Sequence, residues 1–186
     1  MPSGINAEKT KCPRFAVQPA FFSALALILA LRLEKDAGLL LVSALLHEAG
    51  HLLCVLLFGG RVESVLLTPF GLRMFTRGDI SRAGEAAALF MGPLVNLFAA
   101  WLFWKGGHTG AAAENLVLGV YNLLPAKGLD GGRLLGLLAP RRGEQAAEMI
   151  GMALAVFFLG LSLYAIRTGE NFIAPLLAAW MMILGR

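Results

Sequence analysis

The sequence predicts an all-α polytopic membrane protein, with about six transmembrane helices and a short membrane-associated β-hairpin between the second and the third. Hydrophobic residues make up 58% of the 186 positions and charged residues only 15%, and the mean hydropathy is +0.71. This balance is typical of membrane domains and not of soluble ones. We expect one membrane domain at 15–186, preceded by a cytoplasmic tail at 1–14.

Apolar runs separated by short polar connectors define the expected membrane-crossing helices: 15–33, 37–58, 85–104, 145–166 and the weaker 171–184. Arg32 and the charged residues 34–36 form the turn between the first two spans. Gly59 and Gly60 end the second span. The last segment has 14 residues and contains Pro175, so it is short for a plain crossing.

The apolar segment 111–138 is too long and too interrupted for one plain span. Its run YNLLPAKGLDGGRLL places polar and helix-breaking residues at membrane depth: Asn122, Pro125, Gly128, Asp130, Gly131 and Gly132. Irregular backbone is tolerated inside a membrane only where protein buries it or where it lines a wet cavity. This segment is therefore a candidate for part of an active site.

Residues 61–76, RVESVLLTPFGLRMFT, break the helical pattern. Branched and apolar residues flank a turn at Pro69, Phe70 and Gly71, which predicts two short strands. The alternative interpretation is an amphipathic connector that lies on the membrane surface.

The net charge of +4 comes from basic residues scattered over the connectors, so nucleic acid is not an expected partner. With the amino terminus in the cytoplasm, a six-span arrangement puts ten lysines and arginines on the cytoplasmic side and four on the other. Lys127 and Arg133, inside the fourth span, complete the total of 16. This asymmetry follows the positive-inside rule. Cys12 and Cys54 lie in a tail and a span, which favours neither a disulfide nor a CxxC metal site.

The strongest functional signal is LHEAGHLL at 46–53, inside the apolar run 37–58. On a helix His47 and His51 lie one turn apart on one face, where both imidazoles can bind one metal ion. Two imidazoles suit Zn²⁺, and Glu48 beside them can act as the general base of a metalloprotease. HExxH also arises by chance, and a histidine on an apolar helix is usually a satisfied core residue. Burial of three ionisable groups without a shared partner is costly, so a metal is the simplest explanation.

A zinc site needs a third protein ligand besides two histidines. The longer motif HExxHxxGxxH is excluded, because Cys54 and Leu57 stand where it requires glycine and histidine. A glutamate-type zinc site would need Glu63, Glu85 or Glu114 as the third ligand, but Glu63 lies in the strand region and the other two lie near span ends.

Asp130 is the better candidate for this ligand. Its neighbouring glycines would let the backbone pack close to the metal helix. Glu48 and Asp130 also lie at one depth, about 15 Å from the cytoplasmic ends of their spans at 1.5 Å per residue.

Two other polar features have open interpretations. Pro93 and Asn96, in the middle of 85–104, predict either a kink with a helix-to-helix hydrogen bond or a direct role in the site. His108 lies in a connector and is expected to be a solvated bystander.

The motifs HEAGH, GPLVN and NLLPAKGLDGG, in this order, resemble those of the site-2 protease family of intramembrane zinc metalloproteases. The resemblance implies that His47, His51 and Asp130 bind zinc. It further implies that Glu48 is the catalytic base and that Asn122 holds the substrate or the oxyanion.

This resemblance covers residues 37–138, the expected catalytic core, and the six-span plan is most similar to the stage IV sporulation branch. The CBS domain usual in that branch and the PDZ domain of other branches are not found up to Arg186. Regulation and substrate identity are therefore open at this point.

The function implied is hydrolysis of a peptide bond within or next to a transmembrane segment, in regulated intramembrane proteolysis. The expected partners are a membrane-protein or membrane-associated peptide substrate and the lipid bilayer. Regulatory membrane partners are compatible with this function. The expected location is a bacterial cytoplasmic membrane, with a multi-pass chain whose amino terminus and active site face the cytoplasm.

The alternative is a non-proteolytic metal-binding membrane protein, either an inactive scaffold or a transporter. A transporter would need ionisable residues along a path through the other leaflet, and the spans offer almost none. A membrane-anchored zinc hydrolase for soluble substrates would need a cytoplasmic substrate domain, which the sequence does not indicate.

Substrate binding leads to a further expectation. A transmembrane helix hides its scissile carbonyl, so the substrate must bind extended and find partners for its freed backbone groups. We expect residues 62–68 to be an edge strand beside the zinc, to which the substrate adds as a further strand.

Overall fold

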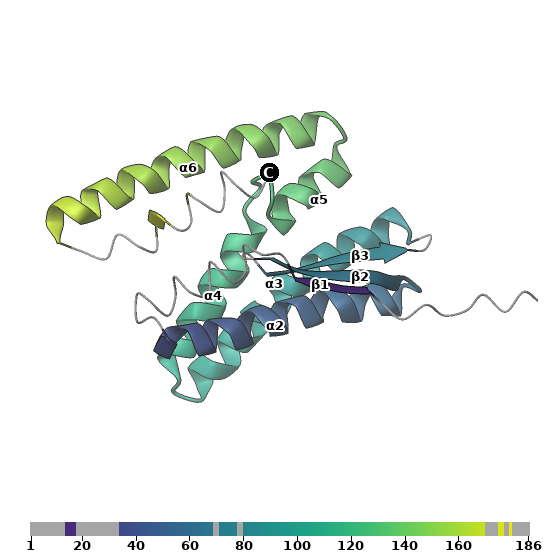
Figure 1. Cartoon of the computed structure of the whole chain (residues 1–186), viewed down its shortest axis with the longest axis horizontal. Helices are drawn as coiled ribbons and strands as arrows, with labels where there is room; N and C mark the ends of the chain where they lie inside the picture. The colour runs from purple at the N-terminus through teal and green to yellow at the C-terminus, as the bar shows by residue number, and fades with distance from the viewer. Residues whose placement is uncertain are drawn as a thin grey trace, which may run out of the picture.

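The computed structural model describes residues 14–17, 34–68, 71–77, 80–169, 175–176 and 179. Its helices are α2 (Glu34–Leu57), α3 (Arg82–Lys105), α4 (Thr109–Leu123), α5 (Asp130–Leu138) and α6 (Arg142–Thr168). Its strands are β1 (Arg14–Val17), β2 (Arg61–Thr68) and β3 (Gly71–Arg77). Helices α2, α3 and α4 pack together, and α5 leads into the long α6 beside it (Figure 1).

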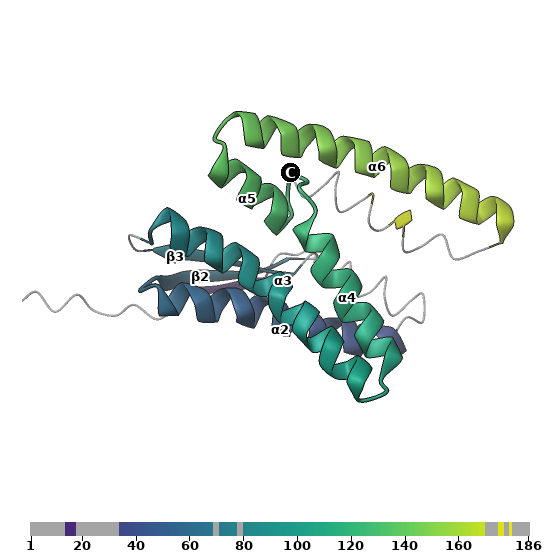
Figure 2. The ribbon, with the colours of Figure 1, turned by 180° about the vertical axis from the view of Figure 1, so that it is seen from behind.

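Small residues allow the first three helices to approach closely. A Cβ on Gly50 of α2 would lie 2.9 Å from the Met91 carbonyl oxygen of α3. A Cβ on Gly119 of α4 would lie 3.1 Å from the Pro93 carbonyl oxygen of α3. Helices that associate inside a membrane use this kind of contact, because apolar side chains are as stable in lipid as between helices and so do not drive the association. Figure 2 shows α3 and α4 from behind, and α3 packs against both α2 and α4.

Among the described residues, three stretches are long and apolar enough to cross a membrane: Gly38–Leu57, Arg82–Lys105 and Arg142–Thr168. Only 22% to 39% of their most apolar windows is buried. Large apolar side chains such as Phe98 and Val156 point outward, 60% and 70% exposed. This surface suits lipid, in which exposed apolar groups carry no penalty. These stretches correspond to the second, third and fifth expected spans.

The amino-terminal predictions need two corrections. Residues 34–36 form the first turn of α2 and not a connector. Residues 15–17 belong to β1 and not to a span, because β1 pairs in parallel with β2 from Arg14 opposite Ser64 to Val17 opposite Leu67. The rest of the first expected span, 18–33, lies outside the described residues, as does most of the sixth.

The three strands form one sheet in the order β1–β2–β3. The two strands expected in 61–76 are present, and β2 pairs antiparallel with β3 from Arg61 opposite Arg77 to Thr68 opposite Gly71. The expectation that residues 62–68 form an edge strand is wrong, because β1 and β3 pair with the two sides of β2.

The predicted interruption of the fourth apolar segment separates α4 from α5. Gly128, with φ of 93°, adopts the left-handed conformation that glycine allows most easily. The Lys127 backbone N–H donates to the Ala147 carbonyl oxygen of α6, at 3.0 Å, and so attaches the connection between α4 and α5 to α6. The connection therefore returns the chain toward α2 and starts α5 at Asp130.

The glycines after Asp130 have a different role from the one expected. A Cβ on Gly131 would collide with the Leu123 carbonyl, and one on Gly132 would collide with the Ala126 carbonyl. Both glycines therefore pack against the end of α4 and its connection, and not against the metal helix. The tight turn between α4 and α5 requires this close backbone contact.

Candidate metal centre

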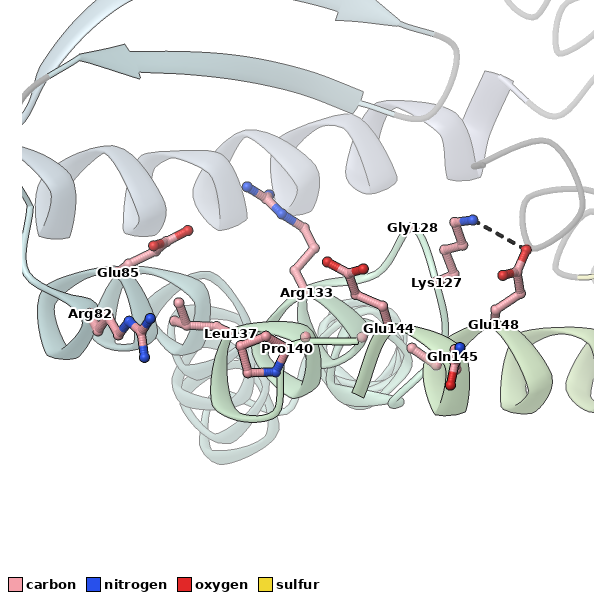
Figure 3. A pocket seen from close by; sticks show the side chains of 13 residues that line it. Arg82, Glu85, Lys127, Gly128, Arg133, Leu137, Pro140, Glu144, Gln145 and Glu148 are labelled. Atoms are coloured by element: carbon pink, nitrogen blue, oxygen red, sulfur yellow. Dashed lines mark hydrogen bonds and ion pairs between the residues drawn. The ribbon is translucent and has the colours of Figure 1, made fainter. Parts of the chain in front are cut away.

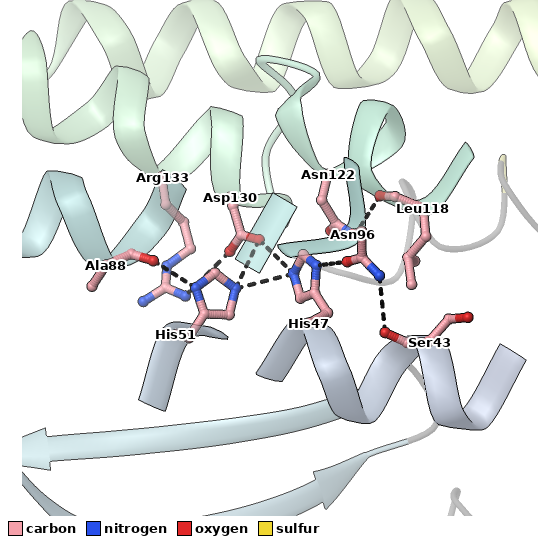
Figure 4. A network of polar contacts seen from close by, with 9 residues as sticks. All are labelled: Ser43, His47, His51, Ala88, Asn96, Leu118, Asn122, Asp130 and Arg133. Atoms are coloured by element: carbon pink, nitrogen blue, oxygen red, sulfur yellow. Dashed lines mark hydrogen bonds and ion pairs between the residues drawn. The ribbon is translucent and has the colours of Figure 1, made fainter. Parts of the chain in front are cut away.

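Three predicted ligands meet where α2 faces the start of α5 (Figure 4). His47 Nε2 and His51 Nε2 lie 3.0 Å and 3.1 Å from the same Asp130 oxygen, Oδ2. The two Nε2 atoms are 3.0 Å apart. His47 and Asp130 are buried and His51 is half-buried. The structure thus brings together side chains that are about eighty positions apart in the sequence.

The outer nitrogen of each imidazole is committed to an acceptor on α3. His51 Nδ1 donates to the Ala88 carbonyl oxygen at 2.7 Å. His47 Nδ1 lies 2.6 Å from Asn96 Oδ1, and the Asn96 amide nitrogen donates to the Ser43 carbonyl oxygen. Asn96 therefore presents an acceptor to His47, and both histidines carry their proton on Nδ1.

Three acceptor atoms consequently point at one another: His47 Nε2, His51 Nε2 and Asp130 Oδ2. Lone pairs at 3.0 to 3.1 Å repel unless a proton or a metal cation lies between them. Tetrahedral zinc with ligand distances of 2.0–2.1 Å would separate its ligand atoms by about 3.3 Å. The donor set and its spacing therefore fit a zinc ion with one remaining position open.

Gly92 of α3 provides the space for this cluster. A Cβ at this position would collide with His51 Nε2 and would lie 2.9 Å from His47 Nε2. Any larger residue would push both imidazoles away from Asp130. Gly92 begins the GPLVN motif, so this motif contributes both space for the imidazoles and, through Asn96, a hydrogen-bond acceptor for one of them.

Glu48 and Asn122 lie near the three ligands but outside the cluster itself. Glu48 is half-buried next to His47 in the chain and interacts electrostatically with His51 and Asp130. The Asn122 amide nitrogen donates to the Leu118 carbonyl oxygen of its own helix, at 3.0 Å. Figure 4 shows Asn122 at the end of α4, on the same side of α2 as the ligands.

The competing acids take no part in this cluster. Within the described residues, the group that could hold a metal contains Asp130 and none of Glu63, Glu85 and Glu114. Glu63 lies on β2, and Glu114 lies on α4. In Figure 4 the strands pass on the opposite side of α2 from the side chains of the cluster.

A cavity of about 600 Å³ lies between α3, α5 and α6 (Figure 3), and its lining includes Gly128 and Gly132, which are close to Asp130 in the chain. Charged side chains line it: Arg82, Glu85, Lys127, Arg133, Glu144 and Glu148. Arg133 also lies near the cluster, with Nη1 3.9 Å from Asp130 Oδ1. The cavity therefore provides a polar region beside a site that apolar helices otherwise surround.

No family model matches the chain, but comparison with known proteins finds relatives of similar sequence. A zinc metalloprotease of Methanocaldococcus jannaschii is 33% identical over 138 residues, which cover 65% of this chain and 40% of that protein. The stage IV sporulation protein FB of Bacillus subtilis is 31% identical over 159 residues, which cover 78% and 54%. The chain thus spans about half the length of these curated relatives.

The solved site-2 protease from Methanocaldococcus jannaschii has the same fold. The two structures superpose with a TM-score of 0.71 and 25% sequence identity, over 94% of this chain and 90% of the other. In sequence and in fold, this chain is thus similar to the site-2 protease family. Its three apolar helices indicate an integral membrane protein.

Two contributors to this candidate centre were not assigned from the sequence. Asn96 had two open interpretations, and the structure supports both, since its amide joins α3 to α2 and also contacts His47. Gly92 was not recognised; the available signal was a glycine in the middle of an apolar span, one turn before Asn96. His108 is exposed in the connection before α4, and its ring packs edge-on against Phe103.

Proposed function

We propose that this chain is a zinc metalloendopeptidase that hydrolyses a peptide bond within or next to a transmembrane segment of a membrane-associated protein. One observation carries this proposal: two imidazole nitrogens and one carboxylate oxygen converge to within 3.0 to 3.1 Å of one another, inside apolar helices. The relatives named zinc metalloprotease and site-2 protease support it. Its biological setting is regulated intramembrane proteolysis, with membrane proteins as both substrates and regulators.

His47, His51 and Asp130 would hold the ion. When bound, zinc polarises a water molecule and the scissile carbonyl group. The Glu48 carboxylate accepts a proton from that water and passes it to the leaving amine nitrogen. Asn122 holds the substrate or the oxyanion through its amide, after exchanging its present bond to Leu118.

Hydrolysis inside a membrane also needs a supply of water. The cavity between α3, α5 and α6 supports such a supply, because six charged side chains line it and Arg133 reaches from it toward Asp130. Charged groups keep a cavity hydrated, whereas the lipid itself contains no water for the reaction.

We further propose a domain of six spans at 15–186 with its catalytic core at 37–138, and a sheet that lies on the membrane surface. The site and the amino terminus face the cytoplasm of a bacterial cell. The count of ten against four basic residues supports this orientation. The cavity supports one part of this arrangement, because Arg82 and Pro140 both line it and so lie on the same side. Reporter fusions after Arg82 and Arg142 test the orientation, which is wrong if they report the outer side.

The catalytic proposal is tested by Glu48→Gln. The amide keeps the shape of the side chain but cannot accept the proton, so cleavage should fall by a factor on the order of 10² or more. Zinc content should remain at the wild-type level, because Glu48 is not among the three ligand atoms. The measurement is mass spectrometry of single-span segments incubated with the protein in vesicles. Full cleavage by Glu48→Gln would remove this residue from the mechanism, whereas a zinc-loaded wild type that cleaves none of them would favour an inactive scaffold.

A further inference from the structure

A chain of buried polar side chains extends from His47 away from the cluster to α4. Ser43, Asn96 and Asn115 are each 0% exposed. Asn96 Nδ2 donates to the Ser43 carbonyl oxygen at 3.0 Å and to Asn115 Oδ1 at 2.9 Å. Asn115 Nδ2 donates to Ser43 Oγ and to the Ala111 carbonyl oxygen, both at 2.9 Å. Three helices thus share one hydrogen-bonded network that ends on a predicted zinc ligand.

The direction of every bond in this network is fixed at its backbone ends. The Ala111 and Ser43 carbonyl oxygens can only accept, so the amide nitrogens of Asn115 and Asn96 must face them. Asn115 then turns its oxygen toward Asn96, and Asn96 turns its oxygen toward His47. A flipped Asn96 would set its oxygen against two acceptors, which is costly in a buried position.

We propose that Asn115 and Ser43 are positioning residues that act through Asn96 to keep the proton of His47 on Nδ1 and so leave Nε2 free for the metal. This inference deepens the proposed function and rests on its zinc site. Outer hydrogen-bond partners of a metal-binding histidine fix its tautomer and ring orientation. Here the control reaches beyond the direct partner, to a residue on a helix that supplies none of the three ligands.

A simpler role for the network is attraction between helices, which polar side chains commonly provide in membranes. The two roles differ in what they predict for the histidines. General attraction between helices would affect His47 and His51 alike, since both are on α2. Positioning through Asn96 affects His47 alone, because the Nδ1 proton of His51 goes to the Ala88 carbonyl, outside the network.

The test uses the full chain in detergent micelles with ¹⁵N-labelled histidine, of which the chain has three. Nitrogen chemical shifts report which ring nitrogen carries the proton, and His108→Gln identifies the exposed third signal. The variants are Ser43→Ala, which removes one acceptor of Asn115, and Asn115→Leu, which removes the amide at similar volume. Ser162→Ala is the matched control, a serine of similar burial on α6, which packs on α5.

Both test variants keep the Ser43 backbone carbonyl as an acceptor for Asn96 but remove a side-chain bond of the network. Both should therefore shift His47 partly toward a mixture of tautomers in the zinc-free protein and leave His51 unchanged. Zinc affinity, measured by chelator competition, should weaken about tenfold in Asn115→Leu, the lower end for loss of an outer partner. If Asn115→Leu does not fold, Ser43→Ala carries the test, with a smaller shift in the same direction.

The proposal is overturned if both variants keep the wild-type His47 signals and zinc affinity within about twofold, well below the usual effect of an outer partner. It is also overturned if the His47 and His51 signals move by the same amount. The tautomer measurement needs neither zinc nor a substrate, so its result is independent of whether the chain cleaves peptide bonds.

Discussion

The proposed histidine ligands and the proposed aspartate ligand are held in place by different physical means. His47 and His51 each donate a short hydrogen bond to α3, at 2.6 and 2.7 Å, and their helix packs along α3. Asp130 is positioned by the shape of the backbone, since Gly131 packs against the end of α4. Its outer oxygen has Arg133 at 3.9 Å, on a side chain that is 63% exposed.

This difference indicates which changes each side of the centre tolerates. The histidines depend on directional bonds and on free space at Gly92, so small changes on α3 should disturb them. The aspartate depends on a tight turn, so it should be insensitive to the exposed charges around that turn. Three substitutions compare the two sides.

The largest effect is expected from Asp130→Ala. It removes the one ligand atom that both imidazoles approach, so zinc affinity should fall by more than the roughly 10- to 100-fold typical of an outer partner. The measurement is metal content after dialysis against a chelator. Glu85→Ala is the control, because it removes a carboxylate that lines the nearby cavity but lies outside the cluster. Undiminished zinc in Asp130→Ala together with loss in Glu85→Ala would show that the ligand assignment is incorrect.

An intermediate effect is expected from Gly92→Ala. The added methyl group would overlap His51 and crowd His47, so zinc affinity should fall on the order of 10- to 100-fold, as for other losses of ligand orientation. Gly160→Ala makes the same change on α6, where a Cβ meets nothing within 4 Å. This control should keep zinc affinity and gain stability of roughly 0.5–1 kcal/mol from helix propensity. Equal zinc affinity in the two variants would contradict the crowded geometry at α3.

The smallest effect is expected from Lys127→Ala, in the turn before Asp130. Its ammonium group pairs with Glu148 at 3.2 Å, but the two side chains are 46% and 42% exposed. Such a pair contributes about 0–1 kcal/mol, and the backbone bond from Lys127 to Ala147 remains in the variant. Thermal unfolding and zinc affinity should therefore both stay close to wild type. A large loss of zinc would mean that this ion pair, and not the backbone, positions Asp130.

The sequence alone determined the features that depend on local patterns. Apolar runs predicted the helices α2, α3 and α6, since a helix needs about twenty apolar residues to cross a membrane, whatever surrounds it. His47 and His51 were predicted to share a face because four residues make one helical turn. Asp130 was preferred because it lies in irregular backbone, which a membrane tolerates only where protein buries it or where it lines a wet cavity. The structure does bring Asp130 to both histidines. The roles of Glu48 and Asn122 stay predictions.

The tertiary structure alone decided which distant groups face one another. Residues 15–17 form β1 because β2 offers its backbone groups along one side, which no property of the apolar run 15–33 reveals. Asn115 joins Asn96 because Gly119 lets α4 pack closely on α3. The direction of their hydrogen bonds then follows from two carbonyl groups on two different helices. Hydrogen bonds are directional and act over one atomic contact, so their partners are defined only after the helices have packed.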